Sequence, residues 1–295
     1  MKRWAGSHLW HAMNRAQRNR VELYRGMAGL RILTFHHTRS HELREVRRIV
    51  RWCRDRLPLA SPADADAVFD GRWPHAQDRV LLTFDDGFES NYAAASWLAD
   101  EGIAAIFFIV PSLVDRTVDE YLAHHARHGV RAHAPLAPSG ARGLYREQVR
   151  EMAAMGHRIG AHNFAHRDLG LITKRADLNY EIQNALDGVA ELTGTPCLDF
   201  AIGFGQPENV SSEAIEHLLA SCPRVYSCHR GLNVPGVTPR FALRHAWESD
   251  HPFNFTLACL DGAGDHHLAS RAREMHRRVG PLPAAATTVP VARTA

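Results

Sequence analysis

Two adjacent aspartates follow an apolar run that has the composition of a buried strand. In the segment LLTFDDG, residues 81–87, the run ends in Asp85, Asp86 and a glycine. Two carboxylates held close together repel each other, so one of them is driven toward its protonated form unless a cation lies nearby. The pair therefore indicates either a turn from which the two side chains point to opposite sides, or a site that holds a positive charge.

A pair of histidines offers possible partners for that charge. In GAHNFAHRDL, His162 and His166 are separated by three residues, so on a helix or a wide turn they face the same way and can share one ion. Two neutral imidazoles and one carboxylate leave coordination positions open for water, which is typical of hydrolytic rather than structural metal sites. The chain contains 20 histidines, so this spacing gains weight only together with the aspartate pair.

The elements that must position these residues alternate along the chain. Helical stretches such as ELREVRRIVRWCRDRL and NYAAASWLADEG lie between short apolar runs. The runs are RILTFHH, RVLLTFDDG, AAIFFIV, HRIGAH, CLDFAIGFG, RVYSCH and FALRHAW. Alternation repeated about seven times predicts parallel strands covered by helices, in a barrel or in a doubly wound open sheet. Both architectures place function at the carboxyl ends of the strands, which is where the polar residues of these runs gather.

Composition excludes several other classes of protein. With 45% hydrophobic and 23% charged residues the chain is an ordinary globular protein, and a net charge of +3 gives no reason to expect a nucleic-acid partner. Five cysteines without a C-x-x-C pair argue against a disulfide framework or a thiolate zinc site. No segment has the pattern of a signal peptide or of a membrane-spanning helix, so we expect a cytoplasmic protein.

The motifs together resemble the polysaccharide deacetylase family, the NodB-like carbohydrate esterases. The resemblance rests on LLTFDDGFESNYAAASWLADEGIAAIFFIVPSLV followed by MGHRIGAHNFAHRDL. It implies a distorted (β/α)7 barrel that removes N- or O-acetyl groups from sugars or glycans with a divalent metal, zinc in the first place and cobalt or another ion otherwise. By position it assigns Asp86, His162 and His166 to the metal and Asp85 to the general base.

The two aspartates can divide these roles. The ion neutralises Asp86, so Asp85 can stay ionised and accept a proton from the water on the metal. A metal lowers the pKa of its water from about 15.7 toward about 7, and the resulting hydroxide is expected to attack the acyl carbonyl. Gly87 is expected to permit the tight turn that brings both carboxylates to the pocket.

Two motifs depart from the family pattern. Residues 200–205, FAIGFG, resemble an F-A-Y-P-F-G motif with Ile202 and Gly203 in place of tyrosine and proline. The backbone N–H of Phe204 matches an oxyanion donor, a contribution typically worth about 3–4 kcal/mol, and the glycine is expected to loosen this loop. Asn163 stands where a hydroxyl residue is usual, and its side chain can still hydrogen-bond a backbone group or a carboxylate.

The last motif leaves the general acid open. RFALRHAW resembles an F-A-L-P-R-like strand and places His245 at or beside the expected arginine, with Arg244 one residue earlier. We interpret His245 as the candidate general acid toward the leaving amine, and a core or surface histidine is the alternative. His36, in LTFHH, matches a histidine common in the first strand of the family and is a candidate for lining the pocket.

The resemblance also suggests a domain organisation. Residues 1–30 are predicted to form a basic helical extension, either with a solvated face or with weak affinity for a membrane surface or an acidic partner. The catalytic domain is expected over residues 31–275, with an irregular His- and Pro-rich insertion at about 112–143. The insertion histidines expected on a mobile surface are His124, His125 and His128. The tail at 276–295 is predicted to be disordered.

Three functions follow from these observations. The leading hypothesis is a metal-dependent hydrolase that deacetylates an N-acetylated sugar or glycan intermediate. The second is a related deformylase or cyclic amidohydrolase, since Ile202 and Gly203 reshape the pocket floor. The third is a degraded deacetylase-like domain that binds glycan without catalysis.

Overall fold

The computed structural model describes residues 2–133, 140–247, 253, 256 and 260–284, with the side chains of all but 2–12 and 268. Its centre is one seven-stranded parallel sheet in the order β6-β5-β4-β3-β2-β1-β7. The strands are β1 (Leu30–Phe35), β2 (Arg79–Phe84), β3 (Ile106–Ile109), β4 (Arg158–Ala161), β5 (Asp199–Ala201), β6 (Arg224–Tyr226) and β7 (His245–Ala246). Every apolar run singled out in the sequence contributes one of these strands.

A single segment connects the two edges of the sheet. Ala242 forms a parallel bridge with Tyr226 of β6, and the Ser227 N–H donates to the Ala242 carbonyl at 2.8 Å. A few residues later, β7 pairs in parallel with Leu33 and Thr34 of β1. The sheet therefore curls into the distorted (β/α)7 barrel implied by the resemblance, and the open doubly wound sheet is excluded.

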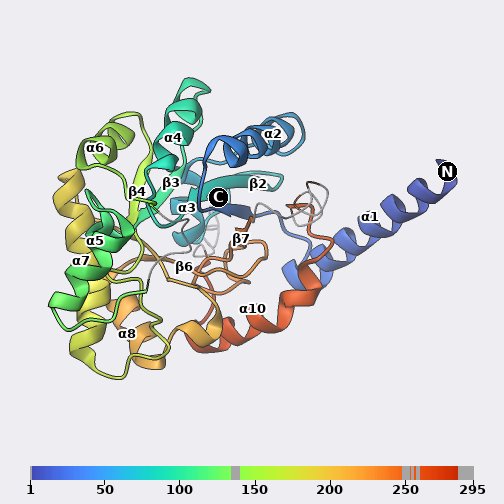
Figure 1. Cartoon of the computed structure of the whole chain (residues 1–295). Helices are drawn as coiled ribbons and strands as arrows, with labels where there is room; N and C mark the ends of the chain where they lie inside the picture. The colour runs from blue at the N-terminus through green and yellow to red at the C-terminus, as the bar shows by residue number, and fades with distance from the viewer. Residues whose placement is uncertain (1, 134–139, 248–252, 254–255, 257–259, 285–295) are drawn as a thin grey trace, which may run out of the picture.

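Helices flank this sheet, most of them on its outer side (Figure 1). They are α1 (Lys2–Tyr24), α2 (Ser40–Arg56), α3 (Pro62–Phe69), α4 (Ser90–Asp100), α5 (Val118–Arg127), α6 (Arg146–Ala154), α7 (Arg175–Thr193), α8 (Ser212–Ser221) and α10 (Asp265–Val279), with short 3-10 turns η1 (Pro111–Leu113) and η2 (Pro207–Asn209). Parallel strands need such crossover helices, and the helices in turn cover the apolar outer face of the sheet.

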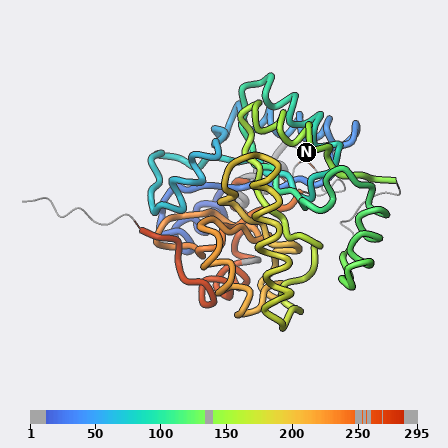
Figure 2. The backbone as a smooth tube through the Cα atoms, turned by 90° about the vertical axis from the view of Figure 1, so that its left-hand side faces the viewer, coloured from blue at the N-terminus to red at the C-terminus, as the bar shows by residue number. Residues whose placement is uncertain are grey.

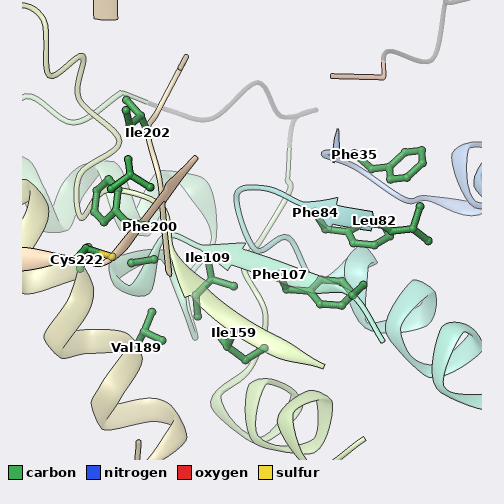
Figure 3. Close-up of a cluster of buried hydrophobic side chains, with 14 of the residues drawn as sticks. Phe35, Leu82, Phe84, Phe107, Ile109, Ile159, Val189, Phe200, Ile202 and Cys222 are labelled. Carbon is green, nitrogen blue, oxygen red and sulfur yellow. The ribbon is translucent and has the colours of Figure 1, made fainter. Parts of the chain in front are cut away.

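The strand register explains why the runs are apolar at every position. Phe35, Phe84 and Phe107 occupy the same level of β1, β2 and β3, so their rings lie on the same face. Figure 3 shows them side by side, with ring centroids 5.2 Å apart for Phe35 and Phe84 and 4.5 Å apart for Phe84 and Phe107. Such stacks contribute about 0.5–1.5 kcal/mol each beyond area burial. Alternate residues such as Ile32 and Leu81 belong to a second buried cluster, so both faces of the sheet are apolar.

The insertion expected to be irregular contains a capped helix. The Glu120 N–H donates to Thr117 Oγ1 at 3.2 Å, and the Thr117 N–H donates to Glu120 at 2.8 Å, which is a capping box at the start of α5. His125 of this helix is fully buried, with Nε2 2.9 Å from Ser112 Oγ and Nδ1 3.0 Å from Tyr180 Oη. The expectation of an irregular segment with surface histidines is therefore wrong for α5 and for His125. Residues 134–139 of the insertion lie outside the described residues.

The end of the N-terminal helix is part of the folded core. Figure 1 shows α1 extending away from the barrel toward its N-terminus. At its other end Asn19 donates to the Gly262 carbonyl at 2.8 Å, and the buried Tyr24 hydroxyl donates to Asp265 at 2.9 Å. The extension predicted over residues 1–30 is thus helical over Lys2–Tyr24 and is anchored to α10. None of the helices in the described part of the chain combines the length and apolarity needed to cross a membrane.

The C-terminal boundary lies later than expected. Helix α10 continues to Val279, and Leu282 is buried beyond it. In Figure 2 the C-terminal segment, drawn in red, runs beside the barrel to its last described residues. A disordered tail that begins at 276 is therefore wrong for residues 276–284, while residues 285–295 lie outside the described part of the chain.

Candidate active site

The turn after β2 delivers the two aspartates to the carboxyl end of the barrel. The Asp85 N–H still bonds to the Phe35 carbonyl at 2.8 Å, which extends the pairing with β1 by one residue. The chain then reverses through Asp86 and Gly87, whose φ angles are 73° and 76°. A Cβ at Gly87 would lie 2.8 Å from the side chain of Ile109, so glycine is required there both by conformation and by space.

Asp86, His162 and His166 converge on one point. Asp86 Oδ1 lies 3.6 Å from Nε2 of each histidine, and the three ligand atoms all lie within 4.8 Å of one another. An ion with ligand bonds of about 2.1 Å in tetrahedral geometry separates its ligands by about 3.4 Å. This is the only such group of three among the described residues, and all three members are buried.

The protonation of these side chains suits a divalent cation. Nδ1 of His162 lies 2.8 Å from the Ala201 carbonyl at the end of β5, a bond that puts the proton on Nδ1 and leaves the Nε2 lone pair toward Asp86. Burial lowers the pKa of His166 well below its ordinary value, which keeps that imidazole neutral. Burial also raises the pKa of Asp86, so a charge there needs a counter-charge. One carboxylate and two neutral imidazoles are donors that zinc and similar ions accept.

Asp85 has a different partner. Arg244 binds it with both ends of the guanidinium, Nη1 to Oδ1 at 2.7 Å and Nη2 to Oδ2 at 2.9 Å. Arg244 is fully buried, and its Nε donates to the Ser227 carbonyl at 2.7 Å. Burial alone would raise the pKa of Asp85, but Arg244 and then His162 outweigh it, so the net shift is downward. Asp85 is therefore held ionised and in one orientation beside the metal position.

Nothing in the sequence patterns indicated this role of Arg244. The last motif places the residue beside His245, and the chemistry was assigned to the histidine. The only related signal was the F-A-L-R run, in which the arginine directly precedes the strand that closes the barrel. Because Ala242 contacts β6 and His245 pairs with β1, Arg244 lies between the two edges, from where its side chain reaches Asp85.

The two other candidate histidines lie at the same cavity. His245 begins β7 opposite Leu33 of β1 and is buried. His36 follows β1, where its carbonyl accepts a hydrogen bond from Asn91 at 2.7 Å. Both side chains line the cavity that contains the two aspartates. Their assignments as general acid and pocket residue stay predictions that this placement allows.

The loop after β5 presents a backbone donor to the cavity. Phe204 has a φ of 62°, and 46% of its surface is exposed. Its ring lies 5.1 Å from the ring of His166 and 5.8 Å from that of His133, which comes from the insertion. No described residue accepts a hydrogen bond from the Phe204 N–H. The group is thus available for a developing oxyanion, and that role stays a prediction.

The two departures from the family pattern are in contact. Asn163, with a φ of 52°, donates from Nδ2 to the Arg167 carbonyl at 2.7 Å and accepts from the Gly203 N–H at 3.3 Å. A proline at 203 has no N–H to donate, and a Cβ there would lie 3.1 Å from Asn163 Nδ2. The expectation that Gly203 loosens its loop is therefore incomplete, because Asn163 ties this loop to the one that carries the metal histidines.

The two aspartates, the metal histidine candidates, Arg244 and Phe204 surround one cavity of about 670 Å³. Its volume lies in the range typical of small-molecule sites, roughly 300–1,000 Å³. Besides the residues already described, its wall contains Gln206, Cys228, His229, Arg230 and Arg271. The arrangement combines a three-ligand metal position, an ionised carboxylate beside it, and a backbone donor, which are the elements of a metal-assisted hydrolase.

Several solved structures share the fold of this chain. IcaB from Ammonifex degensii is 21% identical with a TM-score of 0.62, covering 80% of this chain and 97% of its own. The deacetylase PplD from Streptococcus pyogenes, solved in complex with acetate, is 15% identical with a TM-score of 0.58 over 79% of this chain and 98% of its own. A de-N-acetylase from Aggregatibacter actinomycetemcomitans is 16% identical with a TM-score of 0.58 over 77% and 98%.

At such identities these structures establish the fold alone. No curated protein sequence matched the chain. The family model for polysaccharide deacetylase matches residues 73–221, which is half of the chain and contains both the aspartate pair and the two metal histidines. The chain therefore belongs to the polysaccharide deacetylase family.

Proposed function

We propose that this protein is a metal-dependent hydrolase that removes an acetyl group from an amino sugar or a glycan intermediate. The observation that carries the proposal is the convergence of Asp86, His162 and His166 within 4.8 Å, with Asp85 held ionised beside them. Membership of the family supports an acetylated carbohydrate as the substrate. Removal of an N-acetyl group is the leading form of the reaction, and removal of an O-acetyl group is the alternative.

The metal position has a defined set of ligands. Asp86, His162 and His166 would hold the ion, with zinc as the first candidate and cobalt or another divalent ion as alternatives. Such an ion supplies a Lewis acid that polarises the acyl oxygen and makes a water molecule acidic. The bond from His162 to the Ala201 carbonyl fixes the ring orientation before the ion arrives, so little reorganisation is needed.

Asp85 is placed to accept the proton of the attacking water. Its carboxylate is ionised because Arg244 offsets the penalty of burial, and the bidentate pair prevents it from rotating toward Asp86. A hydrogen-bonded base of this kind is typically worth about 10²–10⁴ in rate. Arg244 is therefore a positioning residue that acts through Asp85.

The remaining steps need a donor for the oxyanion and an acid for the leaving group. Phe204 lines the cavity, its N–H has no acceptor among the described residues, and it would bind the negative charge on the acyl oxygen. When the C–N bond breaks, His245 would give a proton to the leaving nitrogen. The products are then acetate and a free amino group. For an O-acetyl substrate, the same proton goes to the leaving oxygen.

Acetate release from metal-loaded protein tests the proposal. Purified protein with zinc or cobalt is expected to release acetate from N-acetylglucosamine oligomers, and Asp85→Asn should abolish the release while metal content is unchanged. The matched control is Asp55→Asn, an exposed aspartate on α2, which should retain full activity.

The outcomes separate the alternative functions. Bound metal without acetate from any glycan, but with hydrolysis of formyl or cyclic-imide compounds, would favour the related amidohydrolase. Protein that binds glycan but keeps neither metal nor hydrolytic activity would be a binding module, and the proposal would be wrong.

A further inference from the structure

The loop that carries the two metal histidines has an unusual backbone. It follows β4, and within it Asn163 and His166 have φ angles of 52° and 48°. Residues other than glycine seldom adopt this left-handed conformation, and it persists only where the surrounding structure holds it. His166 is itself a candidate metal ligand, so the position of its imidazole depends on whatever keeps the loop in this shape.

One buried carboxylate of α7 binds the backbone of this loop. The side chain of Glu181 is fully buried, and its Oε2 accepts hydrogen bonds from three backbone N–H groups. The donors are Phe164 at 3.3 Å, Ala165 at 2.9 Å and Arg167 at 3.4 Å. These residues lie on both sides of His166 in the chain. A single side chain therefore fixes the backbone before and after that ligand.

Other segments bind the carbonyl groups of the same loop. Ser112 Oγ of η1 donates to the Phe164 carbonyl, and the His133 N–H of the insertion donates to the Ala165 carbonyl at 3.1 Å. These contacts tie the loop to its neighbours through its acceptors, whereas Glu181 binds its donors. Since a buried backbone N–H is costly to leave without an acceptor, the loop depends on this carboxylate to keep its shape.

The burial of a carboxylate at this point of α7 needs a reason. Its buried neighbours along the helix are apolar, namely Leu178, Ile182, Ala185 and Leu186. Burial raises the pKa of Glu181, and the backbone N–H groups together with Arg167, whose Nε lies 3.8 Å from Oε1, only partly oppose this. A buried polar group costs free energy unless it is hydrogen-bonded, and here the bonds all go to the histidine loop.

We propose that Glu181 is a positioning residue that holds the 162–167 loop in the shape that lets both imidazoles reach one ion. It does not line the cavity, so it would act through His166 without touching the ion or the substrate. This inference rests on the proposed metal-dependent function and adds a residue to it. Groups that orient metal ligands from behind typically account for about 10–100-fold in metal affinity.

The zinc affinity of two variants tests the proposal without using activity. Glu181→Met has a similar length but is apolar, so it leaves the three N–H groups without their acceptor. Glu181→Gln keeps an acceptor oxygen at the same reach and removes the charge. We expect Glu181→Met to weaken zinc binding by about 10–100-fold and Glu181→Gln to recover most of that loss. Calorimetric titration of the metal-free proteins measures both dissociation constants.

A second measurement reports the geometry of the ligands. The visible absorption spectrum of the cobalt-loaded protein depends on coordination geometry, and it should change in Glu181→Met but not in Glu181→Gln. The matched control is Leu186→Ala, which removes a buried core side chain from the same helix. It should lower the stability of the whole protein while zinc affinity and the cobalt spectrum stay as in the wild type. An equal loss of zinc affinity in this control would overturn the proposal.

The outcomes separate the role of Glu181 from the deacetylase function. Wild-type zinc affinity and an unchanged cobalt spectrum in Glu181→Met would overturn the positioning role and leave the proposed function standing. Weaker zinc binding that Glu181→Gln rescues, in a protein that releases no acetate, would support the positioning role and contradict the function. If Glu181→Met does not fold, Glu181→Asp replaces it, because its carboxylate is one methylene too short to reach the loop. Unchanged zinc affinity in that variant would equally overturn the role.

Discussion

The two ends of the barrel contain similar charged residues, but these residues are paired differently. At the amino end, Arg158, Asp199 and Arg224 begin β4, β5 and β6. Arg224 binds Asp199 through bonds of 2.9 and 2.8 Å, and Arg158 binds Asp66 of α3 through two bonds of 2.7 Å. Each of these three side chains has an opposite charge within the chain.

The carboxyl end has no such balance. Asp85 is matched by Arg244, while Asp86 lies beside the imidazoles of His162 and His166. The cavity at the amino end, about 720 Å³, is as large as the one at the metal position, about 670 Å³. Cavity size therefore does not distinguish the two ends. The difference is that the amino end pairs these charges with one another, whereas at the carboxyl end three potential ligand atoms converge on one point.

Removal of the metal should have the largest effect. Chelation, or His166→Ala, is expected to reduce acetate release by more than about 10³-fold, because the Lewis acid contributes several kcal/mol. Adding zinc back should restore the chelated wild type but not the variant. Zinc at 100 times its dissociation constant should also raise the free energy of unfolding by about 2.7 kcal/mol.

The control for the metal prediction is His266→Ala, at an exposed histidine of α10. It should keep both the activity and the thermal shift on zinc addition. Wild-type activity that survives complete removal of metal, checked by elemental analysis, would contradict the prediction and the proposed mechanism together.

Arg244 and Arg224 each form an ion pair at one end of the barrel, and substituting each tests whether the two ends differ. Arg244→Met leaves Asp85 buried without its partner, so we expect a loss of about 3–5 kcal/mol in unfolding free energy and a loss of activity. Arg224→Met should cost less, about 1–3 kcal/mol, since Asp199 keeps the Tyr226 hydroxyl at 2.8 Å and Arg158 at 3.6 Å. Denaturant unfolding and acetate release measure both variants. Equal costs, or inactivation by Arg224→Met in its folded state, would show that the two ends do not differ as described.

The hydrogen bond between the Gly203 N–H and Asn163, which joins their two loops, can be tested by a double-mutant cycle. Gly203→Pro removes the N–H that Asn163 accepts, so we expect kcat to fall by about tenfold, in line with one lost hydrogen bond at a positioned site. Asn163→Ala should have a similar effect. The double variant should lose less than the sum, with a coupling of about 0.5–1.5 kcal/mol in activation free energy. Additive effects would mean that the two residues act separately.

Two buried histidines should produce the smallest effect, on the pH dependence of stability. Burial lowers the pKa of both His125 and His229 to about 4. Between that value and the ordinary pKa near 6.5, the unfolded chain binds protons that the folded chain does not, so stability falls as the pH decreases through this window. Each histidine contributes up to about 1.4 kcal/mol per pH unit there.

His125 and His229 also differ in their surroundings. His125 already bonds to Ser112 and Tyr180, while His229 faces the cavity. His125→Gln should therefore lower the slope of unfolding free energy against pH by about one proton between pH 4 and 6.5. Urea titrations at several pH values measure the slope. An unchanged slope would contradict a neutral His125 in the folded protein.

Local patterns were sufficient to predict the strands and to single out the candidate metal ligands. The apolar runs predicted all seven strands because residues buried on both faces of a parallel sheet must all be apolar. Asp86 and His162 lie at the ends of such runs, where parallel strands meet at one edge, and His166 follows His162 at a spacing that lets both face one ion. The resemblance to the family then singled out these three as candidate metal ligands. The capping box of Thr117 and Glu120 is also a local pattern. It was overlooked because the insertion is rich in histidine and proline.

Contacts between segments far apart in the sequence could not be predicted from local patterns. Arg244 and Asp85 are 159 residues apart, and nothing in the sequence near either residue shows that the segment containing Arg244 closes the barrel. The same holds for Asn163 and Gly203, each of which looked like a defect when considered alone. The burial of His125 depends on Tyr180 of α7, another distant partner.

The sequence by itself determined which residues end each strand, and with them the family and the candidate metal ligands, because strand pattern and turn chemistry depend on neighbours along the chain. Only the tertiary structure decided which cation holds Asp85 and how the two unusual loops support each other. Those properties depend on distances between side chains far apart in sequence, and electrostatic energy in a buried site is governed by such distances.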